Sequence, residues 1–114
     1  MREVLIISDN EEMSRWMRWC LEDMGFAVRR SRSLENSFLE AHGSPFLVIV
    51  DSDAIDEESW RAKEYLAWFH RRSPVLLLAN PDAYDQLQEE CDRCLPRAVG
   101  REQFVNCLRE LGRF

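Results

Sequence analysis

Lysine is almost missing from this sequence: Lys63 is the only one, and arginine supplies the other basic residues. Acidic residues outnumber basic ones, 21 to 15, which gives a net charge of −6. This balance argues against a nucleic-acid-binding surface, because neutralising phosphates needs clustered Lys and Arg. No apolar run approaches the length of a membrane span, and the opening MREVLIIS lacks the pattern of a secretory signal peptide. We therefore expect a cytoplasmic protein that binds neither nucleic acid nor membranes.

Cysteine is also scarce, with four residues at positions 20, 91, 94 and 107. A domain of this size can rely on its core, so these cysteines fit a reduced cytosolic chain better than a disulfide framework. Cys91 and Cys94 have the CxxC spacing of redox and zinc sites, but one pair supplies only two ligands. We interpret most of the cysteines as small buried side chains. His42 and His70 lie near predicted helix ends, and no motif gives either one a chemical role.

What the sequence does have is a regular alternation of two patterns. Short apolar runs predict five strands, at residues 4–7, 26–30, 46–50, 75–79 and, more weakly, 94–95. Apolar residues at helical spacing predict five helices between and after them, at about 11–24, 33–41, 58–71, 81–91 and from 101 onward. The expected core faces of four helices are Met13, Met17, Cys20, Leu21 and Met24; Ala62, Tyr65, Leu66 and Phe69; Ala83, Tyr84, Leu87 and Cys91; and Phe104, Val105, Leu108 and Leu111.

This alternation predicts an α/β fold with a parallel sheet covered by helices on both faces. At 114 residues, the pattern suits a flavodoxin-like (βα)5 three-layer sandwich with strand order 2-1-3-4-5. The chain contains no repeat, linker or low-complexity segment. We expect residues 1–114 to form a single domain.

In this order and spacing, five segments make the chain resemble a response regulator receiver domain of the CheY-like kind. They are VLIISDN, LEDMGFAV, FLVIVDSD, SPVLLLAN and CLPRAVGREQFVNCLREL. The resemblance implies a two-component signalling protein in which Asp51, ending the third strand, accepts a phosphoryl group from a histidine kinase. It also implies a Mg²⁺ site, which here would use Asp9, Asp51 and the backbone carbonyl of Asp53.

Several positions that the family uses for phosphorylation are altered. Ser8 replaces one of the two acids expected after the first strand, which would weaken the metal site. Ala79 stands where a Thr or Ser hydroxyl normally ends the fourth strand, and a methyl group cannot bind a phosphoryl oxygen. Arg97 replaces the family's Lys, which is not a conservative change. Cys94 corresponds to the aromatic residue that normally reports the switch. The resemblance is therefore to a degenerate, pseudo-receiver variant.

We expect a non-enzymatic signalling module that acts through protein–protein interaction without a phosphorylation-driven switch and requires no cofactor. The alternative is a genuine receiver phosphorylated on Asp51 with Mg²⁺. An enzyme on this fold is disfavoured, because the sequence has no Gly-rich phosphate loop and no nucleophile–base pair. Partners would be a histidine kinase or a downstream signalling protein, with a possible homodimer.

The altered positions also have structural interpretations. Asp51 could accept backbone hydrogen bonds at the end of its strand, or pair with Arg97. Arg97 is expected to form a salt bridge with Asp51 or Asp9, replacing the charge of the metal. Ser8 could cap the first helix.

Two surfaces are candidates for protein binding. The first lies on the fourth and fifth helices, where charges of both signs suit a two-fold dimer: Gln88, Glu89, Asp92, Arg93, Arg101 and Arg109. The second contains Trp16, which flanks the core face of the first helix, and Trp19, which points away from it. We expect the first surface to mediate self-association and the second to bind a different partner or stack on arginine.

Overall fold

The computed structural model describes residues 2–41 and 43–112, so His42 lies outside the described residues. Its five strands form one parallel sheet in the order β2-β1-β3-β4-β5, which confirms the predicted topology. The strands are β1 (Glu3–Ile7), β2 (Ala27–Ser31), β3 (Leu47–Asp51), β4 (Val75–Ala79) and β5 (Arg93–Pro96). The helices are α1 (Glu11–Asp23), α2 (Leu34–Leu39), α3 (Ser59–His70), α4 (Pro81–Leu87) and α5 (Arg101–Leu111), with short 3-10 turns η1 (Ser52–Ala54) and η2 (Gln88–Glu90).

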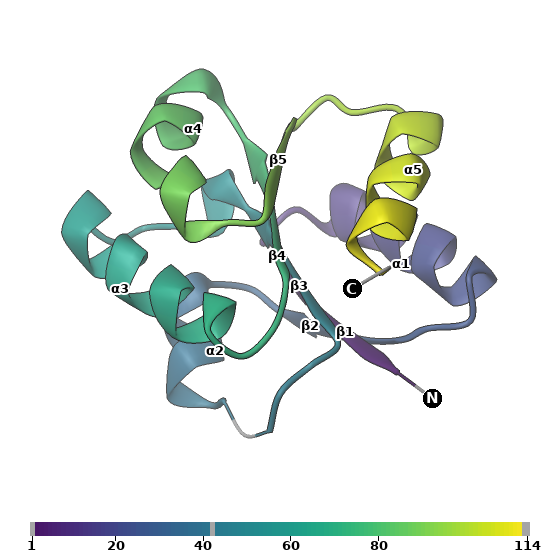
Figure 1. The fold of residues 1–114 in the computed structure, drawn as a ribbon, viewed down its shortest axis with the longest axis horizontal. Helices are drawn as coiled ribbons and strands as arrows, with labels where there is room; N and C mark the ends of the chain where they lie inside the picture. The colour runs from purple at the N-terminus through teal and green to yellow at the C-terminus, as the bar shows by residue number, and fades with distance from the viewer. Residues whose placement is uncertain (1, 42, 113–114) are drawn as a thin grey trace.

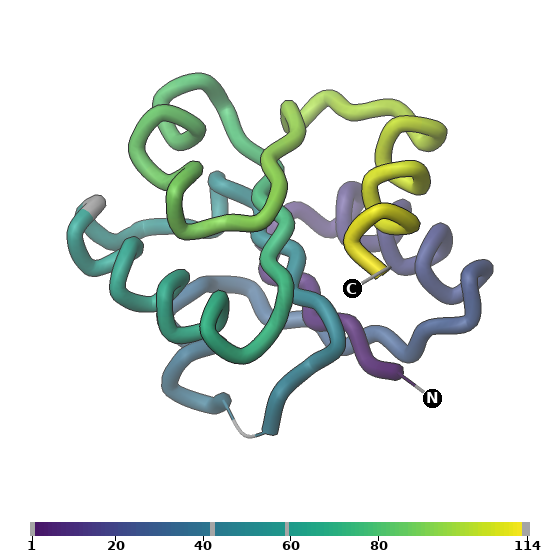
Figure 2. The backbone as a smooth tube through the Cα atoms, viewed as in Figure 1, coloured from purple at the N-terminus to yellow at the C-terminus, as the bar shows by residue number. Residues whose placement is uncertain are grey.

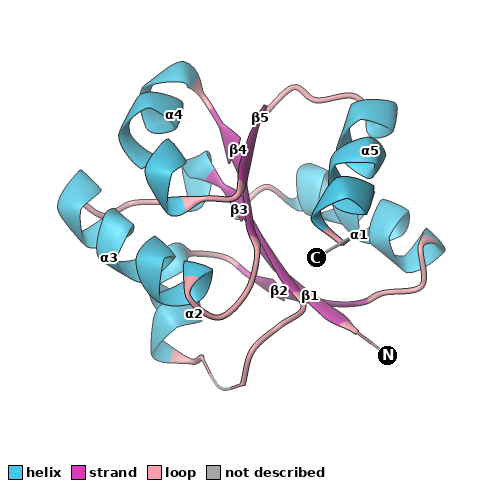
Figure 3. Cartoon of the chain, in the orientation of Figure 1, coloured by secondary structure: helices cyan, strands magenta, loops and turns pink. Residues whose placement is uncertain are grey.

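The helices form two layers with the sheet between them (Figure 1). Helices α2, α3 and α4 cover one face, and α1 and α5 cover the other, as the secondary-structure colouring in Figure 3 also shows. The tube in Figure 2 shows β1 and β3, far apart in sequence, side by side at the centre of the molecule. Residues 4–7 of β1 and 47–50 of β3 are apolar and almost fully buried, as the continuous hydrophobic runs predict.

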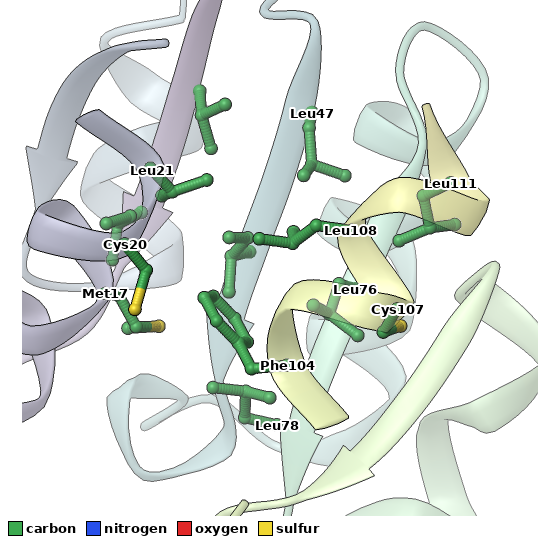
Figure 4. Close-up of a cluster of buried hydrophobic side chains, with 13 residues drawn as sticks. Met17, Cys20, Leu21, Leu47, Leu76, Leu78, Phe104, Cys107, Leu108 and Leu111 are labelled. Carbon is green, nitrogen blue, oxygen red and sulfur yellow. The ribbon is translucent and has the colours of Figure 1, made fainter. Parts of the chain in front are cut away.

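Each sheet face has its own core. Figure 4 shows the α1/α5 side, where Phe104 and Leu108 of α5 point toward Met17 and Leu21 of α1. Cys20 and Cys107 are buried in this cluster, whereas Cys91 and Cys94 pack against the opposite one. The cysteines therefore lie in two groups on opposite faces of the sheet.

Local sequence signals set where the helices begin and end. The side chains of Asn10, Ser33 and Asn80 each accept a hydrogen bond from the backbone N–H three residues later, which caps α1, α2 and α4. Pro81 occupies the first turn of α4, where its missing N–H costs no hydrogen bond. Gly25 follows α1 with φ of +92°, a conformation that other residues rarely adopt.

Two predictions about helix faces are wrong. Helix α4 ends at Leu87, before Cys91, where the chain tightens into η2. Tyr84, inside α4, is 45% exposed rather than buried. On α5 the buried residues are Phe104, Cys107, Leu108 and Leu111, and Val105 is only partly buried. Their i, i+3, i+4, i+7 spacing centres the buried stripe away from Val105.

Within the described part of the chain, none of the helices is both long enough and apolar enough to span a bilayer.

Candidate functional site at the carboxyl edge of the sheet

The candidate site lies where three parallel strands end. Ser8 follows β1, Asp51 is the last residue of β3, and Arg97 follows β5. Because the carboxyl ends of parallel strands meet at one edge of the sheet, residues more than forty positions apart come into contact there. This edge is where ligands bind in open α/β sheets, as the sequence predicts for Asp51.

The carboxylate of Asp51 is fully buried and has a donor on each oxygen. Oδ1 accepts hydrogen bonds from Arg97 Nε at 2.6 Å and from the backbone N–H of Asp53 at 3.1 Å. Oδ2 accepts from the Ser8 hydroxyl at 3.0 Å and from Arg97 Nη2 at 3.2 Å. Arg97 and Asp51 form a bidentate ion pair, a geometry that suits guanidinium and carboxylate groups. The predicted ion pair between Arg97 and Asp51 is therefore present.

The Arg97 guanidinium also contacts the neighbouring acid. Its Nη1 atom lies 2.9 Å from Asp53 Oδ2, so one arginine pairs with both acids of this edge. The hydrogen bond to Asp51 raises the pKa of Arg97, and burial opposes this effect. A permanently charged group thus occupies the space directly against both oxygens of Asp51.

Ser8 connects Asp51 to the edge strand β2. It is fully buried, and besides donating to Asp51 its Oγ accepts from the backbone N–H of Asn10 at 3.2 Å. The N-cap of α1 is Asn10, so the interpretation of Ser8 as the cap of this helix is wrong. The carbonyl of Ser8 accepts from Arg30 Nε on β2 at 3.2 Å. The sequence does not point to Arg30, because an arginine on an edge strand is usually exposed to solvent.

Ala79 brings no hydroxyl to this edge. Its methyl group is buried, 7% exposed, and packs in the core on the α2/α3/α4 side. The next residue, Asn80, donates its backbone N–H to Ser52 Oγ at 3.2 Å. The end of β4 is therefore tied to the chain after β3 by a fixed hydrogen bond rather than by a side chain that could turn toward Asp51.

The arrangement does not fit a Mg²⁺ ion. Both oxygens of Asp51 already face a guanidinium, and a divalent cation there would lie against that positive charge. Among residues 2–41 and 43–112, no three Asp, Glu, His or Cys side chains are grouped as a metal ion requires. Asp9 is exposed, and the structure does not assemble it with Asp51 and Asp53 into a metal-binding group.

Several solved structures have a fold similar to that of this chain. The chemotaxis response regulator CheY4 of Vibrio cholerae matches with a TM-score of 0.79 and 16% identity, over 97% of this chain and 98% of that one. The chain has the receiver-domain fold. The receiver domain of the sensor histidine kinase PA1611 of Pseudomonas aeruginosa PAO1 gives 0.81 and 14%, over 96% of each chain. The non-phosphorylated HemR receiver domain of Leptospira biflexa gives 0.80 and 13%, over 100% of this chain and 96% of that one.

No family model matches the sequence, and the search of curated proteins found no match. The likeness to receiver domains therefore concerns the fold, and the predicted loss of the phosphorylation switch stays a prediction.

The two cysteines of the CxxC segment contact each other beside β5. The Cys91 Sγ lies 3.5 Å from the Leu87 carbonyl oxygen, and its single proton can be donated either there or to the Cys94 sulfur. The hydrogen bond with Cys94, together with burial, raises the pKa of Cys91. The same hydrogen bond lowers the pKa of Cys94, against the effect of burial. Cys94 is therefore the thiol of this pair that ionises first.

The two predicted binding surfaces are not separate, which corrects the sequence analysis. The Arg101 guanidinium lies 4.4 Å from the centre of the Trp19 ring and 3.4 Å from Asp23 Oδ2, so it belongs to the α1 side. Trp16 is partly buried against Phe104, at a ring distance of 5.1 Å.

Two of the other charged candidates are held by neighbours. Asp92 contacts His70 at 3.3 Å and accepts the backbone N–H of Val75, and Arg93 pairs with Glu110 at 2.8 Å. Arg109 lines a cavity of about 420 Å³ between α1 and α5, together with Arg101.

Proposed function

We propose that this chain is a receiver-like signalling module that acts through protein–protein contacts and not through a phosphorylation-driven switch. The observation that carries the proposal is the ion pair of Arg97 with Asp51, in which the guanidinium contacts both carboxylate oxygens. A carboxylate held in this way is neither free to attack a phosphodonor nor free to bind a metal ion.

The second support is the absence of a responding group. A ligand shifts a conformational equilibrium only through contacts that differ between the two states. Ala79 supplies a buried methyl where a hydroxyl would have to move toward a phosphoryl group. Arg97 already contacts Asp51 and Asp53 in the unmodified chain. Phosphorylation of Asp51 would therefore create no new contact with Arg97 that could favour a second conformation.

The experiment that tests this proposal compares two small-molecule treatments of the wild type. The chain is incubated with Mg²⁺ and acetyl phosphate, and separately with Mg²⁺ and beryllofluoride. Intact mass reports phosphorylation, and backbone amide spectra report a change of state. We expect no added phosphoryl group and no amide shifts near Asp51, with Asp51→Asn giving the same result. Phosphorylation that Asp51→Asn abolishes would contradict the proposal.

The alternative is a genuine receiver phosphorylated on Asp51 with Mg²⁺. Its support is the place of Asp51 at the carboxyl edge of the sheet, together with the fold it shares with PA1611, whose structure contains a magnesium ion coordinated in the active-site cleft. This alternative requires Arg97 to leave Asp51 before a metal ion can enter.

A partner would be another signalling protein or a second copy of this chain. We propose the surface containing Trp19 and Arg101 as the contact region, because Trp19 is 57% exposed on an otherwise charged helix face. Large exposed aromatic residues beside arginine are frequent at the energetic centres of interfaces. No enzymatic activity and no required cofactor are part of this proposal.

A further inference from the structure

A second polar site lies between α1 and the edge strand β2, away from Asp51. It is a cavity of about 220 Å³ lined by Ile6, Glu11, Ser14, Arg15, Arg18 and Arg30. Ile6 and Arg30 are partners in the β1–β2 register, so their side chains point to the same sheet face, which α1 covers. This volume is several times the roughly 30 Å³ that one water occupies in the liquid.

Two polar atoms at this cavity are buried and have no hydrogen-bond partner. Ser14 is 4% exposed, and its hydroxyl contacts no acceptor or donor among the described residues. The Nη2 atom of Arg30 is likewise buried and unpartnered within the described chain. Leaving such groups unsatisfied costs free energy, and native proteins rarely do so unless something outside the chain completes the bonds. Arg30 Nη2 can only donate and the Ser14 hydroxyl can donate as well, so one acceptor placed between them would satisfy both.

The charges around the cavity indicate which acceptor fits. Arg15 and Arg18 are exposed on α1 and add two positive charges to that of Arg30. Glu11 is the one acid in the lining; its carboxylate lies 3.9 Å from Arg30 Nη1 and 3.5 Å from Arg32 Nη2. The lining is therefore net positive, although the whole chain has a net charge of −6. Such a site favours a doubly charged anion over a neutral molecule or chloride.

We propose that this cavity binds a small divalent oxyanion of the phosphate class, free or as the phosphate group of a larger molecule. The Ser14 hydroxyl and Arg30 Nη2 would donate to its oxygens, and Arg15 and Arg18 would neutralise its charge at the opening. Arginine suits this role because its planar fork matches the oxygens of a phosphate group. The site does not involve Asp51 and is independent of whether Asp51 is phosphorylated.

The binding experiment titrates the wild type with inorganic phosphate while amide shifts are followed. Sodium chloride at matched ionic strength is the reference, and a phosphate monoester such as ribose 5-phosphate is the second ligand. We expect saturable shifts at Ser14 and Arg30 with phosphate and none with chloride. Tighter binding of the monoester would identify the phosphate group of a larger molecule as the ligand, and weaker binding would identify the free ion. Equal responses to phosphate and chloride would overturn the proposal.

Variants separate ligand binding from folding. Ser14→Ala and Arg18→Gln each remove one contact and should weaken phosphate binding about tenfold, the loss expected for one charge-assisted hydrogen bond. Glu11→Gln removes the opposing carboxylate and should tighten binding. Arg109→Gln, which removes the same charge from α5, is the matched control and should bind as the wild type. Wild-type affinity in both Ser14→Ala and Arg18→Gln would contradict the site.

Ser14→Ala also tests why the hydroxyl is there. Because the group has no partner in the unliganded chain and alanine favours helices, this variant should have a higher Tm than the wild type without phosphate. It should also lose the stabilisation that phosphate gives the wild type. A lower Tm in the absence of phosphate would mean that the hydroxyl serves the fold itself, and would overturn the assignment.

Discussion

The Nε atom of Arg97 lies 2.6 Å from Oδ1 of Asp51, and the two residues differ sharply in their access to solvent. The Asp51 side chain is 1% exposed, whereas that of Arg97 is 28% exposed and has a second partner in Asp53. Removing Arg97 should therefore affect stability differently from removing the charge of Asp51. Without Arg97, a buried carboxylate keeps only neutral donors. Without the charge of Asp51, the guanidinium still has Asp53 and water.

We predict that Arg97→Met destabilises the fold by about 3 kcal/mol, the cost of an uncompensated buried charge. Asp51→Asn should cost less, about 2 kcal/mol, because the amide keeps one accepting oxygen but turns an NH2 group toward the donors on the other side. Urea denaturation of both variants measures the difference. Asp53→Asn is the control and should be nearly neutral, since its side chain is 55% exposed. Equal losses in Arg97→Met and Asp51→Asn would show that the pair is not asymmetric.

The ion pair is one of several arrangements that the sequence predicts, because the carboxyl ends of parallel strands share one edge of the sheet. Topology does not decide between Asp51 and Asp9 as the partner of Arg97, because β4 separates β3 from β5 and the long arginine side chain has to cross it. The structure places Ser8 directly after β1, Ala79 at the end of β4 and Arg97 directly after β5.

The contacts between helices could not be predicted in the same way. Arg101 and Trp19 belong to helices at opposite ends of the sequence, and their contact depends on how α1 and α5 pack side by side. The cavity at Ser14 and Arg30 depends on the distance between α1 and β2, and the hydrophobic periodicity of the sequence does not determine that distance. The end of α4 at Leu87 is not predictable either, because the chain tightens into η2 without a Gly or Pro signal.

Restoring the phosphorylation site should require changing several residues together. We predict that Ser8→Asp, Ala79→Thr and Arg97→Lys, combined in one chain, give Mg²⁺ binding and phosphorylation of Asp51 by acetyl phosphate. Ala79→Thr alone should give neither, because the Arg97 guanidinium still contacts both oxygens of Asp51. Mg²⁺ titration by amide shifts and intact mass after acetyl phosphate treatment measure the two properties. Phosphorylation of the Ala79→Thr single variant would show that Arg97 does not block Asp51.

The cysteines should differ in reactivity as a function of pH. The hydrogen bond from Cys91 lowers the pKa of Cys94, so the thiolate of Cys94 forms at a lower pH than that of an ordinary cysteine. Burial raises the pKa of Cys20 and of Cys107. We therefore predict that iodoacetamide labels Cys94 first, as read by peptide mass mapping across a pH series.

Cys91→Ala is the matched variant for this experiment. It removes the donor to Cys94, so the labelling of Cys94 should shift to higher pH. An unchanged pH profile for Cys94 in Cys91→Ala would show that Cys91 has no influence on it.

The last prediction concerns the surface formed by Trp19 and Arg101. The sequence alone suggests that a dimer would depend on Arg101 and Arg109 and tolerate Trp19→Ala. Because Arg101 lies over the Trp19 ring, the two side chains form one contact, and loss of either should remove the other from its position. We now predict that Trp19→Ala and Arg101→Glu both weaken self-association, measured by sedimentation velocity over a concentration series.

Lys63→Glu on α3 reverses one charge on the opposite face of the sheet and should associate as the wild type. The two test variants should also differ from each other in salt. Arg101→Glu changes a charge that pairs with Asp23, so its effect should shrink as added salt screens the surface, whereas the effect of Trp19→Ala should persist. A wild-type chain that remains monomeric at every concentration, or a dimer weakened by only one of the two changes, would contradict the assignment of this surface.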